Sequence, residues 1–353
     1  MSAWSRAGIV GGALGVAAAS TAAAAVTSRQ RHRRRAAALI GGDSAAARVS
    51  TVAADDGVPL VVEEVGSEGA PLTVVFVHGF CLTMQSWHFQ RQLFATTPDT
   101  RLVFYDQRGH GRSGTGRGSS YTVDQVGRDL QAVLRTVVGQ GQVVLVGHSM
   151  GGMTIMALAR QRPDLFDAQV AAVALLSTAA DGLGLNRVGL GAGNPLVQGL
   201  RRLARFRPEL LRLGRTPVDL LISPIVRAMS YGDRYLSPSV AEFSEAMIAA
   251  TPLRTIADFL PTLSTHDERA ALPAIAGRPM LVLCGDADRL TPLRHTRVIA
   301  DVLPEADLVV VPGAGHLVQL EQPDLVNDAL VRLCERAVSA RGEAGRRVVT
   351  GSD

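Results

Sequence analysis

Short apolar runs that are rich in β-branched residues recur along most of the chain, separated by stretches long enough for a helix. The runs lie at 58–64, 72–77, 101–105, 142–146, 170–176, 279–284 and 307–311. Strands that are buried on both faces have nearly continuous apolar sequences, and strands that alternate with helices usually pair in parallel. The pattern predicts an α/β fold in which helices cover both faces of a mostly parallel sheet.

The regular spacing of these runs is broken once. About 100 residues separate the fifth run from the sixth, whereas a connection within a compact domain needs far fewer. Helix-like patches fill this interval. We therefore expect a core formed by 49–181 and 266–340, with a helical lid inserted at 182–265. Residues 341–353 are expected to form a flexible C-terminal tail.

The basic charge of the chain is concentrated near its start. Residues 1–48 hold seven arginines and one aspartate and contribute +6 to the net charge of +4, so the rest carries −2. A folded body without excess positive charge is not expected to bind nucleic acid. Lysine is absent, which excludes a phosphate-binding loop of the GxxxxGK type.

Cofactor and metal motifs are also missing from the sequence. Cys81, Cys284 and Cys334 are too few and too scattered for a disulfide framework or a zinc ribbon, and suit reduced thiols in the cytoplasm. Residues 109–114 fit GxGxxG, but they lead into a loop-like stretch, whereas a dinucleotide-binding fold needs an apolar helix there. We expect neither a metal ion nor an organic cofactor.

The N-terminal segment has the length and pattern of a membrane anchor. Residues 7–28 carry no charge and are followed by an arginine-rich run at 29–35. As a helix they would be roughly 33 Å long, close to the apolar thickness of a bilayer. Positive charge after the apolar stretch favours an uncleaved anchor with the catalytic body in the cytoplasm. The alternatives are a signal peptide that is removed on export, and a cytoplasmic or surface-lying extension.

The sequence GHSMGG at 147–152 follows an apolar run and precedes an Ala-rich, helix-like stretch. It fits GxSxG, in which the glycines permit a sharp strand-to-helix turn that exposes the serine. Ligands of open parallel sheets bind beside the carboxyl ends of the strands, where this serine would lie. Ser149 is therefore the candidate nucleophile.

A serine that attacks an acyl carbon needs two backbone N–H groups for the oxygen that becomes negative. They typically come from the residue after the nucleophile and from the loop after an earlier strand, which the run at 72–77 would form here. In this chain the oxyanion hole would be formed by the amides of Met150 and Phe80. The neighbouring His78 is expected to brace this loop.

Candidate triad partners follow the last two apolar runs. Asp286 and Asp288 come after 279–284, and His316 comes after 307–311. A histidine can remove the serine proton, and an aspartate can fix the histidine tautomer and stabilise the imidazolium. The order Ser, Asp, His along the chain is typical of serine hydrolases built on a parallel sheet.

Five ordered motifs make residues 49–340 resemble the α/β-hydrolase superfamily. They are HGF at 78–80, DQRGHGRS at 106–113, GHSMGG at 147–152, GDAD at 285–288 and GH at 315–316. The resemblance implies that Asp288 is the triad acid, that Asp286 braces its loop, and that Asp106 and Arg108 are structural. A rarer variant of the family has its acid after the family's sixth strand. The run at 170–176 would correspond to that strand, and Asp181 is available after it.

The resemblance also implies a serine hydrolase that cleaves a carboxylic ester through an acyl-enzyme on Ser149. The expected apolar lid favours a lipid-like or other apolar acyl ester, as in lipases and monoacylglycerol-type esterases. Thioester, carbon–carbon and cofactor-free perhydrolase or haloperoxidase chemistry are alternatives with the same triad. A non-catalytic small-molecule-binding protein on this fold is the alternative from another class. The sequence specifies no oligomeric state.

Overall fold

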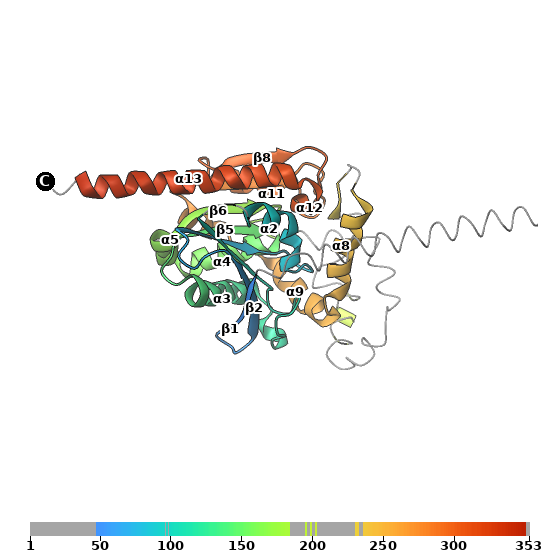
Figure 1. Ribbon diagram of the computed structural model, residues 1–353. Coiled ribbons are helices and arrows are strands. Elements are labelled where there is room, and N and C mark those ends of the chain that lie inside the picture. Colours follow the sequence, from blue (N-terminus) through green and yellow to red (C-terminus); the bar gives the residue numbers. More distant parts are fainter. Residues whose placement is uncertain are drawn as a thin grey trace, which may run out of the picture.

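The computed structural model describes residues 47–95, 97, 99–183, 195, 198, 199, 202, 230–232 and 236–350. In these ranges the chain forms an eight-stranded sheet with helices on both sides (Figure 1). The strand order across the sheet is β1-β2-β4-β3-β5-β6-β7-β8. The strands are β1 (Arg48–Ala53), β2 (Pro59–Val65), β3 (Leu72–Val77), β4 (Thr100–Tyr105), β5 (Val143–His148), β6 (Val170–Leu176), β7 (Met280–Gly285) and β8 (Asp307–Val311).

The helices that the structure describes are α2 (His88–Phe94), α3 (Val123–Val133), α4 (Met150–Gln161), α5 (Pro163–Gln169), α8 (Pro238–Ala250), α9 (Leu253–Thr265), α10 (Leu272–Ile275), α11 (Leu293–Val302), α12 (Val318–Glu321) and α13 (Pro323–Thr350). Shorter 3₁₀ segments are η2 (Met84–Trp87), η3 (Gly118–Ser120) and η7 (Arg269–Ala271), and a π-helical segment, η4 (Leu134–Val138), follows α3.

The pairing of the strands confirms the predicted fold class. Strands β3 to β8 pair in parallel, and β2 pairs antiparallel with both β1 and β4. The seven apolar runs of the sequence coincide with β2 to β8. Strand β1 is additional, and most of its residues are exposed at the sheet edge, so no apolar run marks it.

Alternate residues of the central strands pack into two apolar layers. Val75 and Val77 of β3 belong to the layer that includes α3 and α4, whereas Val74 and Phe76 belong to the layer that includes α2 and α13. All six residues of β3 and of β5 are buried. The carboxyl end of β5, where Ser149 follows, is therefore held between two packed layers.

The long interval between β6 and β7 contains α8 and α9. The two ends of the segment 182–265 meet, because a Cβ on Gly182 would lie 3.1 Å from the carbonyl oxygen of Ser264. Helix α8 shares an apolar cluster with Leu82 and Leu317, which follow β3 and β8. The helices of this insertion thus pack against loops at the carboxyl edge of the sheet.

The C-terminal part of the chain differs from the prediction. Helix α13 continues to Thr350 and projects beyond the sheet in Figure 1. It therefore takes in most of the segment 341–353, for which the sequence predicts a flexible tail.

The membrane anchor that the sequence predicts needs correction. Residues 7–28 lie outside the described residues. Within the described ranges, no helix has both the length and the apolar character needed to cross a bilayer. Helix α13 is long enough, but charged residues recur along it. A membrane-anchored catalytic domain is therefore unsupported and is not retained.

Candidate active site

Ser149 lies in the sharp turn between β5 and α4. Its φ of 52° and ψ of −117° form a strained conformation that residues other than glycine rarely adopt. The flanking glycines let the backbone close up. A Cβ on Gly147 would lie 2.6 Å from the carbonyl carbon of Gly151, and a Cβ on Gly151 would collide with the carbonyl oxygen of Val77. The turn therefore fixes the serine hydroxyl at the carboxyl edge of the sheet.

The structure brings together the three residues that the sequence proposes as a triad. The Oγ of Ser149 lies 2.9 Å from Nε2 of His316, and Nδ1 of His316 lies 2.9 Å from Oδ2 of Asp288. Ser149 comes from the β5–α4 turn, Asp288 from the loop after β7 and His316 from the loop after β8. The hydrogen bonds form one continuous chain from hydroxyl to carboxylate.

Asp288 is buried and receives several hydrogen bonds. The amides of Leu290 and Thr291 donate to Oδ1, at 2.9 and 2.8 Å, and the Thr291 hydroxyl donates to Oδ2 at 2.7 Å. Burial alone would raise the pKa of the carboxyl, but the charge of His316 and the hydrogen bonds from His316 and Thr291 outweigh it and hold that pKa below its usual value. Asp288 is thus an ionised acceptor for His316.

The two other candidate acids have different partners. Asp181 accepts a hydrogen bond from Nδ1 of His295 at 2.7 Å and is occupied there. Asp286 accepts from the amide of Gly313 at 2.6 Å, which ties the loop after β7 to the loop after β8. This geometry matches the bracing role expected of Asp286 and separates Asp181 from the hydrogen bonds of the triad.

The two amides proposed for the oxyanion hole are both unpaired among the described residues. Met150 is the first residue of α4, so its N–H has no acceptor in the helix, and the Phe80 N–H has no hydrogen-bond partner in the described part of the chain. Gly79 lets their loops approach, because a Cβ there would lie 2.6 Å from Nδ1 of His148 and 3.2 Å from Cβ of Ser149. Both donors are thus available to a substrate oxygen.

The loop that carries Phe80 is held by a buried polar network. His78 donates from Nδ1 to the carbonyl of Gly79 at 2.8 Å and accepts at Nε2 from the amide of Gln107 at 2.9 Å. The Gln107 side chain donates to the His78 carbonyl and accepts from Thr154 of α4. Burial lowers the pKa of His78 to about 4, so this imidazole is neutral and braces the loop.

Asp106 and Arg108 also occupy structural positions. The carboxylate of Asp106 accepts from the amides of Met84 at 2.8 Å and Arg112 at 2.9 Å, which fixes the loops on either side. The buried guanidinium of Arg108 binds the carboxylate of Asp129 with two hydrogen bonds of 2.6 Å. Neither side chain takes part in the hydrogen-bond chain of Ser149.

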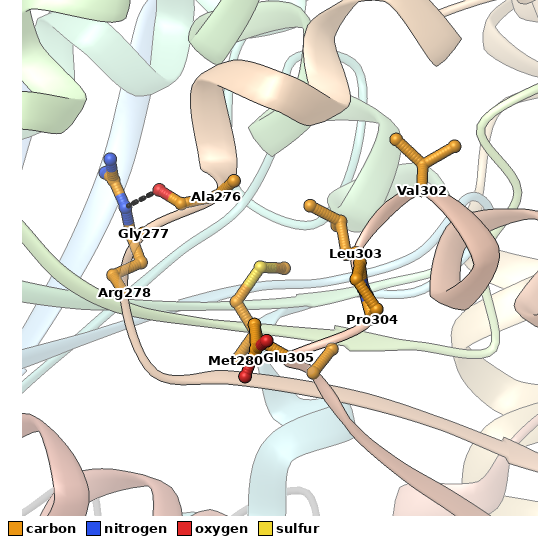
Figure 2. A pocket seen from close by; sticks show the side chains of 9 residues that line it. Ala276, Gly277, Arg278, Met280, Val302, Leu303, Pro304 and Glu305 are labelled. Carbon is orange, nitrogen blue, oxygen red and sulfur yellow. Dashed lines mark hydrogen bonds between the residues drawn. The ribbon is translucent and has the colours of Figure 1, made fainter.

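A separate small pocket lies away from this site. Figure 2 shows it between residues 276–280, which lead into β7, and residues 302–306, which lead into β8. Its volume is about 50 Å³, room for one or two water molecules. Because it lies at the amino ends of the strands, it is on the opposite edge of the sheet from Ser149. In the described part of the chain, no three His, Cys, Asp or Glu side chains are grouped to hold a metal ion.

Three polar residues of the site are not singled out by the sequence. Thr291 supports Asp288, Gln107 supports the Phe80 loop, and His148 bonds through Nε2 to the carbonyl of His316 at 2.8 Å. Thr291 and Gln107 each lie within three residues of a recognised motif residue, which is the only signal the chain offers. The contacts of Gln107 and His148 are with distant segments of the chain, whereas Thr291 bonds to Asp288 three residues earlier.

Comparison with known proteins identifies the family of the chain. A model of the alpha/beta hydrolase fold matches residues 73–323, and the chain belongs to that family. An sn-1-specific diacylglycerol lipase of Mus musculus is 25% identical over 276 residues, covering 77% of this chain and 84% of that protein. A putative 2-succinyl-6-hydroxy-2,4-cyclohexadiene-1-carboxylate synthase of Bacillus subtilis is 26% identical over 285 residues, covering 78% and 94%.

A solved structure gives the same picture. A thermophilic esterase from Thermogutta terrifontis has a TM-score of 0.64 and 26% identity, with coverage of 82% of this chain and 99% of that chain. These relatives support a hydrolase. Their names range from lipase and esterase to synthase at nearly equal identity, so family membership alone does not define the bond that this protein cleaves.

Proposed function

We propose that the protein is a serine hydrolase that cleaves carboxylic esters through an acyl-enzyme on Ser149. The observation that carries this proposal is the continuous hydrogen-bond chain from Ser149 through His316 to Asp288. A neutral imidazole bonded to the serine hydroxyl can act as its general base, and the buried carboxylate stabilises the imidazolium that results.

The proposed reaction has two halves. In the first, His316 Nε2 takes the proton of Ser149 while Oγ attacks the ester carbonyl, and the amides of Phe80 and Met150 donate to the resulting oxyanion. The imidazolium then gives its proton to the leaving alcohol, and the acyl group stays on Oγ. In the second half, His316 activates a water that attacks the acyl-enzyme and releases the acid.

The surroundings of the site support an apolar acyl group. The Phe80 ring lies 5.8 Å from the ring of Phe259 in α9, and Phe243 of α8 belongs to the apolar cluster around Leu82 and Leu317. The insertion thus presents apolar side chains to the loops that carry the oxyanion donor and the histidine. We propose that it acts as a lid over a lipid-like or other apolar acyl ester.

Hydrolysis rates across ester chain lengths test both the reaction and the substrate class. Each buried methylene is worth about 0.8 kcal/mol, so kcat/KM should rise by roughly fourfold per methylene until the pocket is filled. The series would run from acetyl to decanoyl p-nitrophenyl esters below their aggregation limits, with an amide and a thioester of matched acyl length. Equal kcat/KM for acetyl and decanoyl esters would reject the apolar pocket.

The matched control is Ser149→Ala protein. Loss of ester hydrolysis in this variant, together with labelling of the native chain by a fluorophosphonate probe, supports the acyl-enzyme. Preference for the thioester would move the substrate class within the same mechanism. Absence of labelling in native, folded protein would instead favour a non-catalytic binding protein on this fold.

A further inference from the structure

Glu321, the last residue of α12, binds two separate segments with one oxygen. Its Oε2 accepts hydrogen bonds from the amide of Gly315 at 3.0 Å and from the amide of Gly232 at 2.9 Å. Gly315 immediately precedes the triad residue His316. Gly232 belongs to residues 230–232, a described part of the insertion between β6 and β7 that we call the strap. One carboxylate therefore joins the histidine loop to the insertion.

Backbone contacts hold the strap against the same loop. The carbonyl of Ser230 accepts hydrogen bonds from the amides of His316 at 2.9 Å and Leu317 at 3.3 Å. Gly232 and Gly315 lie so close that a Cβ on either one would collide with the backbone of the other's segment. The strap and the histidine loop therefore have little freedom to move independently while Glu321 joins them.

The carboxyl group of Glu321 is largely removed from solvent, which disfavours its charged form. Burial raises the pKa of its carboxyl above the usual value, although the amides of Gly232, Gly315 and Leu317 and the charge of His316 act in the opposite direction. Its Oε1 is buried and has no hydrogen-bond partner among the described residues. A neutral amide oxygen could accept from the two glycine amides at a smaller desolvation cost. His316, which becomes charged in the proposed reaction, interacts electrostatically with this carboxyl group.

We propose that Glu321 is a positioning residue for the hydrolase reaction, which aligns His316 through Gly315 and makes that alignment depend on the strap. This inference rests on the proposed function. Displacement of the strap would shift Gly315 and with it the Nε2 atom that takes the Ser149 proton. The carboxylate also favours the imidazolium, which faces Asp288 at Nδ1 and the ring of His148 5.0 Å away.

The first test compares two variants of Glu321 with Asp324→Asn, which removes a charge from an exposed residue in the first turn of α13. Glu321→Ala removes the shared acceptor of the two glycine amides, and Glu321→Gln keeps an acceptor but removes the charge. We would measure the rate at which a fluorophosphonate labels Ser149 and the kcat and KM for p-nitrophenyl butyrate, each from pH 5 to 9. Glu321→Ala should lower the labelling rate and kcat by roughly 10- to 100-fold, since misplacement of a reacting group has this effect. KM should change much less.

The pH profile separates the charge from the hydrogen bonds. With glutamine at 321 the imidazolium loses a neighbouring negative charge, so the acid limb of kcat/KM should move to lower pH. Asp324→Asn should leave rate and profile unchanged. Circular dichroism and urea unfolding of each variant give the folded fraction to which the rates are normalised.

A double-mutant cycle tests the connection to the strap. Gly232→Ala forces the strap away from the histidine loop, so it should remove the same interaction as Glu321→Ala. The loss in the double variant should then be clearly smaller than the product of the two single losses. Multiplicative losses would show that Glu321 acts independently of the strap and would overturn this coupling.

The outcomes distinguish the positioning role of Glu321 from the reaction itself. If native protein is not labelled at all, the proposed function fails and this inference fails with it. If native protein is labelled, Glu321→Ala is labelled equally fast and Glu321→Gln has the same acid limb, the serine hydrolase stands and the role of Glu321 is overturned.

Discussion

At the scale of single residues, the histidine partner of each acid distinguishes the two candidates for the triad carboxylate. Asp288 and Asp181 both follow strands of the parallel sheet, but Asp288 bonds to His316 and Asp181 bonds to His295. We expect Asp288→Asn to lower kcat by about 10³- to 10⁴-fold, because an amide cannot stabilise the imidazolium and favours the wrong tautomer. Asp181→Asn should stay within about threefold of the native kcat. Steady-state kinetics on one ester check both, and the reverse ranking would reassign the acid.

The nucleophile and the base should behave as a unit. Ser149→Ala and His316→Ala should each reduce ester turnover by roughly 10³- to 10⁶-fold, and the double variant should be little worse than either single one. The reason is that proton transfer and attack occur in the same step. The test is the steady-state rate of ester hydrolysis by each purified variant. Asp181→Asn, purified in parallel, is the control. Independent, multiplicative losses would argue against a shared mechanism.

The sequence specified the triad far better than its supports. Ser149 and His316 were predictable because each follows an apolar run and lies in a short motif that contains glycine. Asp288 was separated from Asp181 by family resemblance alone, since both positions satisfy the rule of strand ends. Gln107 and Glu321 act through contacts with distant segments, which no local pattern encodes, whereas Thr291 bonds to Asp288 three residues earlier.

At the scale of elements, the β5–α4 turn depends on close backbone contact. A Cβ on Gly151 would collide with the carbonyl oxygen of Val77, whereas a Cβ on exposed Gly69 would have only the Ser67 hydroxyl, 3.9 Å away, within 4 Å. Gly151→Ala should therefore lower the free energy of unfolding by about 1–3 kcal/mol, the usual cost of overpacking. Gly69→Ala should stay within about 0.5 kcal/mol of native. Urea unfolding curves compare the two, and equal midpoints would mean that the turn can relax.

The strands that could be predicted from the sequence are those whose residues are buried. Strands β2 to β8 were visible because most of their residues are apolar, and β1 was missed because the edge strand RVSTVA is largely exposed. The helices α8 and α9 were expected only as helix-like patches in a long interval. Their contacts with Leu82 and Leu317 could not be predicted, because they depend on how the insertion folds back.

At the scale of the whole molecule, three buried histidines predict sensitivity to acid. Burial lowers the pKa of His78 to about 4, and those of His110 and His148 to about 3. In the unfolded chain a histidine has its ordinary pKa near 6.5, so the unfolded state binds more protons as the pH falls below that value. Stability should then decrease from about pH 6.5 towards pH 4, by up to about 1.4 kcal/mol per pH unit for each histidine.

Urea midpoints at pH 7.5, 6.5, 5.5 and 4.5 measure this dependence. Replacing His110 by glutamine should flatten the slope between pH 6.5 and 4.5, because one proton fewer is taken up on unfolding. An exposed basic residue such as Arg254, replaced by glutamine, is the comparison that should leave the slope unchanged. Midpoints that are constant from pH 7.5 to 4.5 would show that these imidazoles are not held neutral.

The strained backbone conformation of Ser149, the proposed nucleophile, lowers the thermal stability of the protein. Glycine adopts a positive φ without steric conflict, so Ser149→Gly should fold into the same turn and resist heating better than the native chain, while losing its chemistry. A library selected only for survival at high temperature would therefore favour removal of the nucleophile. Engineering for higher thermal stability therefore has to retain Ser149 and introduce stabilising substitutions elsewhere in the sheet and helices.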